Sequence, residues 1–228
     1  MFCIFVFAVL LCSWSCVSSA PLDNIEGTYQ VRKNLHYSNK TTVTWGENSA
    51  KIWNVTVSLS SSTATYDCSN TTSYECLDPS WIYDYNKLWG KSRCGYAHGH
   101  HVDSDRFVWR RCSDPSCNAY IEGTKRVQLA AYSYDNGVAP FENPKDLMKE
   151  FATTIETDKK YMLIMAMDAT GLSTFTLADA SGNPMETQTV QHTVTCPDNY
   201  FEGTVQGWYF GGTCRAPEDV LVTYSSGV

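Results

Sequence analysis

An alternation of apolar and polar residues along Lys51 to Leu59 marks this segment as a β-strand with one buried face. The apolar side chains of one parity are Trp53, Val55, Val57 and Leu59. The same rhythm, or a short apolar run bounded by turn residues, recurs along most of the chain. It predicts further strands at residues 27–37, 106–111, 126–134, 161–168, 174–178, 187–195, 204–210 and 220–224. The sequence therefore predicts an all-β, mainly antiparallel fold.

Turn chemistry separates the predicted strands. Asp135-Asn136-Gly137 and Ser181-Gly182-Asn183-Pro184 supply residues that tolerate positive φ between apolar runs. The flanks of the second turn predict an antiparallel meander. One short helix is expected where Asn143 is a suitable N-cap and Pro144 takes the first helical position, with Leu147, Met148 and Phe151 on one face.

The first 20 residues have the features of a secretory signal peptide. An apolar run ends in small and polar residues before Pro21, with small side chains at the positions that signal peptidase reads. An uncleaved anchor is the alternative, but polar residues begin at Ser13, short of the ~20 apolar residues of a membrane span. We therefore expect a signal peptide at residues 1–20 and a single secreted domain, without a membrane span, at residues 21–228.

Seven cysteines remain after removal of the signal peptide: Cys68, Cys76, Cys94, Cys112, Cys117, Cys196 and Cys214. In an oxidising compartment these thiols are expected to form disulfides. Five of them fall in residues 68–117, where the strand rhythm breaks down, so that span is predicted to be a disulfide-rich insertion. An odd number leaves one thiol over, which could be free, buried or joined to a second copy in a disulfide-linked homodimer.

Glycosylation and charge restrict the partners of the chain. Sequons at Asn39, Asn54 and Asn70 predict N-glycans, which require a solvent-facing position. The net charge of −7 argues against nucleic acid, because phosphates would be repelled without a strong basic patch. We expect an extracellular glycoprotein that does not bind nucleic acid.

Two short motifs carry a family resemblance. Gly27-Thr28-Tyr29 follows the signal peptide, and Thr157-Asp158-Lys159 precedes an apolar strand. The chain resembles a divergent lipocalin, a family in which an early Gly-x-Trp and a later Thr-Asp-Tyr occupy comparable places. Tyr29 stands where the family has tryptophan, and Lys159 where it has tyrosine. The resemblance implies an up-and-down β-barrel that holds one small apolar or amphipathic ligand.

In such a barrel, one parity of the strands would line the ligand. The candidates are Trp53, Val55 and Val57 on one strand and Tyr161, Leu163 and Met165 on another. The inward face cannot be assigned from sequence, and the same residues could fill an ordinary core.

No established catalytic motif is present in the sequence, so no enzyme activity is expected. The strongest polar cluster runs from His98 to Asp105. His98, His100, His101 and Asp103 could bind Zn²⁺ or Cu²⁺, since imidazole suits both metals. The alternative is an exposed polar loop, and no other cofactor is expected.

The sequence-based hypothesis is therefore a secreted carrier of a small apolar ligand. A structural protein of an extracellular matrix, shell, cuticle or egg coat is the first alternative, favoured by the acidic charge, the glycans and the odd cysteine. A metal-dependent enzyme that uses the His98 to Asp105 segment is the second.

Overall fold

The computed structural model describes residues 26–39, 43–45, 52–66, 85–92, 101–111, 125–168, 170–193, 195, 203–206, 208–211 and 215–226. The expected signal peptide, all seven cysteines of the expected disulfide pool, His98, His100 and Asn70 lie outside these residues. The predictions made for them stay predictions.

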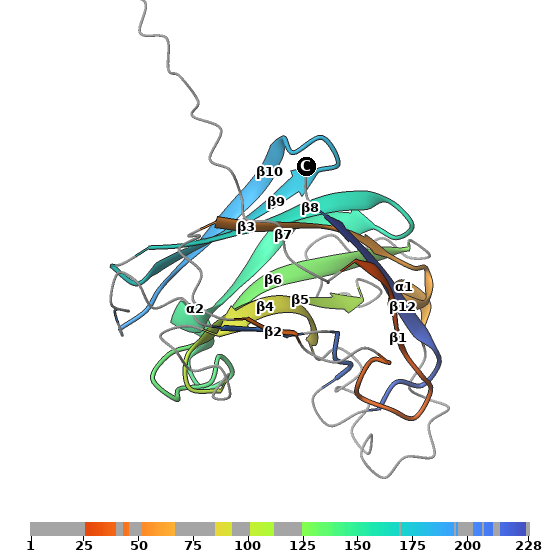
Figure 1. Ribbon diagram of the computed structural model, residues 1–228, viewed down its shortest axis with the longest axis horizontal. Coiled ribbons are helices and arrows are strands. Elements are labelled where there is room, and N and C mark those ends of the chain that lie inside the picture. Colours follow the sequence, from red (N-terminus) through yellow and green to blue (C-terminus); the bar gives the residue numbers. More distant parts are fainter. Residues whose placement is uncertain are drawn as a thin grey trace, which may run out of the picture.

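The described strands form two six-stranded sheets that face each other, and every pairing is antiparallel (Figure 1). Sheet A has the order β1 (Gly27–Val31), β12 (Val220–Ser226), β3 (Ile52–Leu59), β8 (Lys160–Met167), β9 (Leu172–Asp179) and β10 (Pro184–Gln191). Sheet B has the order β2 (Val43–Trp45), β11 (Gly203–Gln206), β4 (Asn86–Ser92), β5 (Ser104–Arg111), β6 (Arg126–Tyr134) and β7 (Met148–Glu156).

The all-β, mainly antiparallel prediction is confirmed, but the described strands do not form one closed up-and-down barrel. In such a barrel each strand pairs with the next along the chain. Here β12 pairs with both β1 and β3, and β11 lies between β2 and β4. The chain therefore crosses between two sheets, and the architecture is a β-sandwich.

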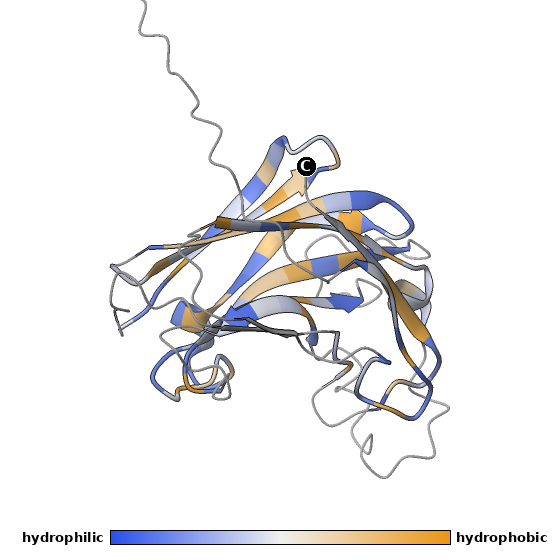
Figure 2. Cartoon of the chain, viewed as in Figure 1, coloured by the Kyte–Doolittle hydropathy of each residue, from blue (hydrophilic) through white to orange (hydrophobic). Residues whose placement is uncertain are grey.

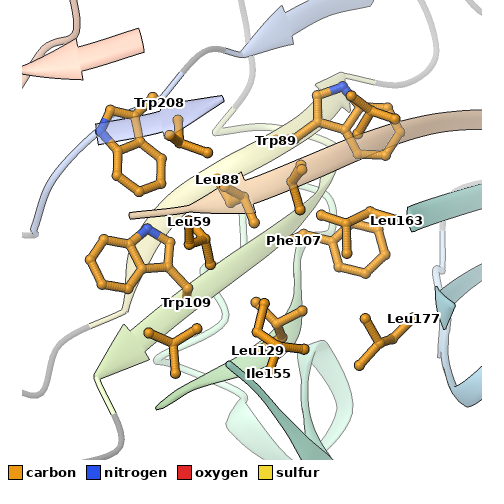
Figure 3. Packing of buried hydrophobic residues seen from close by; sticks show 14 of the residues in the cluster. Leu59, Leu88, Trp89, Phe107, Trp109, Leu129, Ile155, Leu163, Leu177 and Trp208 are labelled. Atoms are coloured by element: carbon orange, nitrogen blue, oxygen red, sulfur yellow. The ribbon is translucent and has the colours of Figure 1, made fainter. Parts of the chain in front are cut away.

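The hydrophobic core lies between the sheets, where the apolar faces of the strands meet (Figures 2 and 3). Of the six residues expected to line a ligand, five have an exposed fraction of 1% or less, and Tyr161 is half-buried against them. The five are Trp53, Val55, Val57, Leu163 and Met165. They pack in the same cluster as Phe107 and Trp109 of the opposite sheet.

The span expected to be an irregular insertion, residues 68–117, contains β4 and β5. These strands pair with each other and lie inside sheet B, with β11 on one side and β6 on the other. The described part of the span is therefore regular. The rhythm was hard to read because buried polar side chains, such as Asn86 and Lys91 of β4, interrupt it.

Two short helices occur among the described residues, α1 (Ser62–Thr65) and α2 (Pro144–Leu147). The predicted helix begins at Pro144 as expected but ends at Leu147, and Met148 begins β7. Phe151 is therefore a strand residue, buried in the core. No helix in this described part is both long and apolar enough to span a membrane.

The expected reversals lie where positive φ is required. Asn136 and Gly137, with φ of 50° and 81°, follow β6, and Gly182, with φ of 85°, lies between β9 and β10. The meander β8–β9–β10 is confirmed. Thr157-Asp158-Lys159 forms the turn between β7 and β8, with Asp158 at a φ of 62°.

Replacing Gly90 with alanine is expected to destabilise the protein by about 1–3 kcal/mol, because overpacking forces the backbone to shift. Gly90 pairs with Arg106 across β4 and β5, and an added Cβ would collide with the Asp105 carbonyl oxygen and Arg106 Cγ. Urea unfolding measures the change, with Ser58→Ala on β3 as the control. An unchanged midpoint for Gly90→Ala would mean that the two strands lie farther apart than described.

Candidate functional site

Strands β5 and β6 carry chemistry on the face of sheet B that points away from the core. Phe107 and Trp109 of β5 point into the core, so Arg106 and Ser104, at the intervening positions, point to the outer face. The register places Tyr132 opposite Arg106 and Tyr134 opposite Ser104. Two polar pairs therefore lie side by side on the outer face.

These side chains form a cationic and aromatic group, here called the outer-face cluster: Lys87, His101, Arg106, Tyr132 and Tyr134. The Arg106 guanidinium carbon lies 5.6 Å from the Tyr134 ring centroid. The His101 and Tyr134 ring centroids are 5.0 Å apart, and those of Tyr132 and Tyr134 are 5.8 Å apart. Arg106 is fully buried, Lys87 and Tyr132 are half-buried, and His101 is exposed.

Burial and mutual repulsion alter the acid–base behaviour of the cluster. Burial, with a smaller contribution from the Arg106 charge, lowers the pKa of Lys87 from 10.5 to about 8. Burial also lowers the pKa of Arg106 to about 10, against the opposing effect of nearby tyrosines and Asp105. The pKa of His101 is lowered by burial and by the charges of Lys87 and Arg106. An amine with a pKa near 8 can serve as a base near neutral pH.

Aromatic rings extend the outer-face cluster beyond Lys87. Lys87 Nζ lies 5.0 Å from the Tyr209 ring centroid, and the backbones of the two residues exchange hydrogen bonds. The His36 ring stacks on Tyr209 at 5.3 Å, and the Tyr37 ring meets it edge-on at 5.1 Å. Tyr37 is 73% exposed. A solvent-facing aromatic surface therefore adjoins a basic group.

A hydrogen-bonded group continues the outer face toward β7. Arg110 donates from Nε and Nη2 to Gln128 Oε1, at 2.9 and 2.7 Å, and pairs with Glu150 at 3.0 Å. Tyr85 donates to the same Glu150 oxygen at 2.7 Å. Burial raises the pKa of the Tyr85 phenol well above its usual range. These contacts hold Arg110 in place on the outer face.

A second group, here called the buried polar cluster, lies on the inner side of the same strands. It consists of Asp103, Asp105, Ser133, Asp135, Ser173 and His192. His192 Nε2 lies 2.9 Å from Asp105 Oδ1, and Nδ1 lies 3.2 Å from Asp103 Oδ1. Ligand atoms of Asp103, Asp135 and His192 all lie within 4.8 Å of one another. Three carboxylates and an imidazole are therefore buried together.

The structure separates the residues expected to bind metal. His101 belongs to the outer-face cluster and Asp103 to the buried polar cluster, because they lie on opposite sides of the sheet B strands. His98 and His100 lie outside the described residues. Of the two described sequons, Asn39 is exposed and Asn54, on β3, is half-buried.

The sequence patterns did not point to Lys87, Arg106, Tyr132, Tyr134 or His192 as site residues. A usable signal was present in β5 and β6, where Ser-x-Arg and Tyr-x-Tyr place polar groups on one parity of strands whose other parity is mainly apolar. Burying a charged side chain costs free energy, so charged residues at alternate positions of a buried strand indicate a polar cluster and not hydrophobic packing.

No protein-family model matches the chain, and no curated protein matches it. Among solved structures, the marine alginate lyase from Aplysia kurodai is similar at 12% identity and a TM-score of 0.43, with 77% of this chain and 67% of that one covered. The alginate lyase from Klebsiella pneumoniae is similar at 11% identity and a TM-score of 0.45, with 76% and 56% covered.

The binding domain of botulinum neurotoxin DC in complex with SialylT is similar at 7% identity and a TM-score of 0.41. The match covers 91% of this chain and 39% of that one. Identities and TM-scores this low do not transfer a function. None of these three structures is a lipocalin, and the lipocalin resemblance stays a prediction.

Proposed function

We propose that the protein binds an acidic polysaccharide on the outer face of sheet B and cleaves it by β-elimination. The observation that carries this proposal is the outer-face cluster, in which the Lys87 amine, with a pKa of about 8, lies among Arg106, His101 and tyrosines. The proposal departs from the expectation that the chain is not an enzyme.

Charge and shape both favour a polyanionic sugar. The chain has a net charge of −7, yet Lys87 and Arg106 lie on one face of neighbouring strands, next to Arg110, whose charge is paired with Glu150. Local positive charge attracts an acidic ligand, even on an acidic protein. The aromatic surface at Tyr37 and Tyr209 offers flat apolar faces of the kind on which sugar rings stack. Carboxylated sugars combine the two requirements.

The chemistry of β-elimination matches the available groups. The step breaks the C5–H and C4–O4 bonds of a uronate residue and forms a C4=C5 double bond. The neutral Lys87 amine takes the C5 proton, and the half-exposed Tyr132 phenol gives a proton to the departing O4. The buried charge of Arg106 acts at short range to favour negative charge as it develops on the sugar carboxylate.

Alginate is the first substrate to test, because it is a polyuronate and because two of the similar proteins are named alginate lyases. The product contains a double bond conjugated to the carboxylate, which absorbs in the ultraviolet. We expect wild-type protein to produce this absorbance and to bind the polymer. Absence of both binding and product with alginate, polygalacturonate and hyaluronan would refute the proposal.

Variants of Lys87 separate binding from catalysis. Lys87→Ala is expected to lower kcat/KM by about 100-fold or more, the usual loss of a general base. Lys87→Arg keeps the positive charge but cannot release its proton near pH 8, so binding should persist while product formation stops. Lys160→Ala, an exposed lysine of sheet A, is the matched control and should leave both unchanged.

The pH profile gives a further check on Lys87. Because only the neutral amine accepts a proton, kcat/KM is expected to rise as the pH increases through about 8. A rate that instead falls through this range would mean that Lys87 acts as a cation. In that case the base is another group.

A further inference from the structure

The buried polar cluster joins the two sheets. Asp105 and Ser133 come from β5 and β6 of sheet B, Ser173 from β9 of sheet A, and His192 directly follows β10. Asp103 and Asp105 have no exposed surface, Asp135 is 6% exposed and His192 is 3% exposed. Carboxylates this deeply buried require positive charge nearby.

Asp105 fixes the orientation of His192. Its Oδ1 accepts a hydrogen bond from Ser133 Oγ at 2.5 Å, and its Oδ2 accepts one from Ser173 Oγ at 2.6 Å. An ionised carboxylate has no hydrogen to donate, so Asp105 can interact with the imidazole only by accepting another hydrogen bond. His192 Nε2, 2.9 Å from Oδ1, is therefore the nitrogen that carries a hydrogen.

The other imidazole nitrogen then faces two carboxylates. His192 Nδ1 lies 3.2 Å from Asp103 Oδ1 and 3.7 Å from Asp135 Oδ1. Asp135 Oδ2 accepts hydrogen bonds from the Thr193 backbone nitrogen and hydroxyl, at 2.9 and 2.7 Å, which turns Oδ1 toward the histidine. One nitrogen and two oxygens thus lie within 4.8 Å of one another.

The two nitrogen–oxygen separations, 3.2 and 3.7 Å, are close to those around a bound cation. In a tetrahedral zinc site with bonds of 2.0–2.1 Å, neighbouring ligand atoms are about 3.4 Å apart. The competing arrangement is a proton on Nδ1, which would be donated to Asp103 at 3.2 Å and would leave Asp135 Oδ1, at 3.7 Å, beyond hydrogen-bond range, whereas a metal ion would contact both carboxylates.

We propose that Asp103, Asp135 and His192 form a structural site for a divalent transition metal, with Zn²⁺ as the best match to one nitrogen and two carboxylate oxygens. Metal-bound histidines commonly donate their other ring N–H to a carboxylate. Asp105 would accept that hydrogen bond from His192 Nε2 here. Only Asp103 was among the expected metal ligands. The site would connect β5 and β6 to the segment after β10, which joins the two sheets.

The test measures zinc bound to the full-length protein. Metal-free protein is incubated with Zn²⁺, passed through a desalting column and analysed by inductively coupled plasma mass spectrometry. We expect wild-type protein to retain about one zinc per chain more than Asp135→Asn or His192→Gln. We also expect zinc to raise the Tm of wild-type protein relative to chelated protein, and this increase to be lost in both variants. Asp146→Asn, which changes an exposed carboxylate outside the cluster, is the matched control.

A milder variant and a spectroscopic measurement protect the test from misfolding. Asp105→Asn is expected to weaken zinc binding by about 10–100-fold, the usual effect of removing such an orienting group. X-ray absorption of wild-type protein should place nitrogen and oxygen, without sulfur, around the zinc. Wild-type protein that binds no zinc, binds it through sulfur, or keeps it in His192→Gln would overturn the proposal. Polysaccharide cleavage does not enter these readouts, so the two proposals fail independently.

Discussion

Replacing Lys91 with methionine is expected to stabilise the protein by about 2–4 kcal/mol at pH 7. Lys91 lies on β4 with no exposed surface, and its Nζ is 3.9 Å from the Trp53 ring centroid. Burial lowers the pKa of Lys91 from 10.5 to about 4, so the folded protein holds a neutral amine. Losing the proton that the unfolded chain carries at pH 7 costs on the order of 4 kcal/mol. Methionine has a similar length and no amine to desolvate.

The effect should depend on pH in a definite direction. Between pH 4 and about 10.5 the unfolded chain binds one proton more at Lys91 than the folded chain, so this lysine makes stability rise with pH. The advantage of Lys91→Met should therefore shrink as the pH approaches 10. Urea unfolding of both proteins at pH 6, 7.5 and 9.5 measures it. A variant that is less stable than wild type at every pH would mean that Lys91 keeps its positive charge in the core.

Replacing Phe107 with alanine is expected to destabilise the protein by about 3–5 kcal/mol, the usual cost of removing a buried phenylalanine. Phe107 has no exposed surface, and its ring lies 6.0 Å from the Trp89 ring, 6.0 Å from Phe151 and 5.3 Å from Phe175. These partners come from β4, β7 and β9, in both sheets. The substitution therefore leaves a cavity where the sheets meet.

A second phenylalanine provides the control for this experiment. Phe141 is 71% exposed, and Phe141→Ala should change the free energy of unfolding by less than about 0.5 kcal/mol. Guanidinium unfolding followed by fluorescence measures both variants. Equal small effects would mean that the core can collapse around position 107, or that the sheets do not pack there.

Local patterning predicted the elements whose own residues determine them. Alternation identified β3, and turn residues around Gly182 identified the hairpin between β9 and β10. Such signals operate within a strand or a reversal, because the period of two and the need for positive φ are properties of a few adjacent residues.

The arrangement of the strands into sheets depends on long-range pairing, which the local sequence pattern does not encode. Whether strands close into a barrel or form two sheets depends on pairings such as β12 with β1 and β3, between segments far apart in the sequence. The helical spacing of Leu147, Met148 and Phe151 was misleading, because pairing with β6 draws Met148 onward into a strand. Tertiary pairing there overrides local preference.

The candidate sites depended on register. Arg106 and Tyr132 become neighbours only through the pairing of β5 with β6, and His192 reaches Asp103 only because sheet A packs on sheet B. Motif searches test short spacings along the chain and cannot detect such groups. Of the expected metal ligands, Asp103 joined the buried polar cluster, with partners 32 and 89 positions away in the sequence.

The division of β5 and β6 into two chemically different faces affects how the gene can vary. Deleting or inserting one residue within either strand would exchange its faces, for example moving Arg106 toward the core and Phe107 to the outer face. Such a frame-preserving change would remove the core contact, the outer-face cluster and the buried carboxylates at once. Length variation among related genes should therefore be confined to the segments between these strands, while within them only substitutions survive.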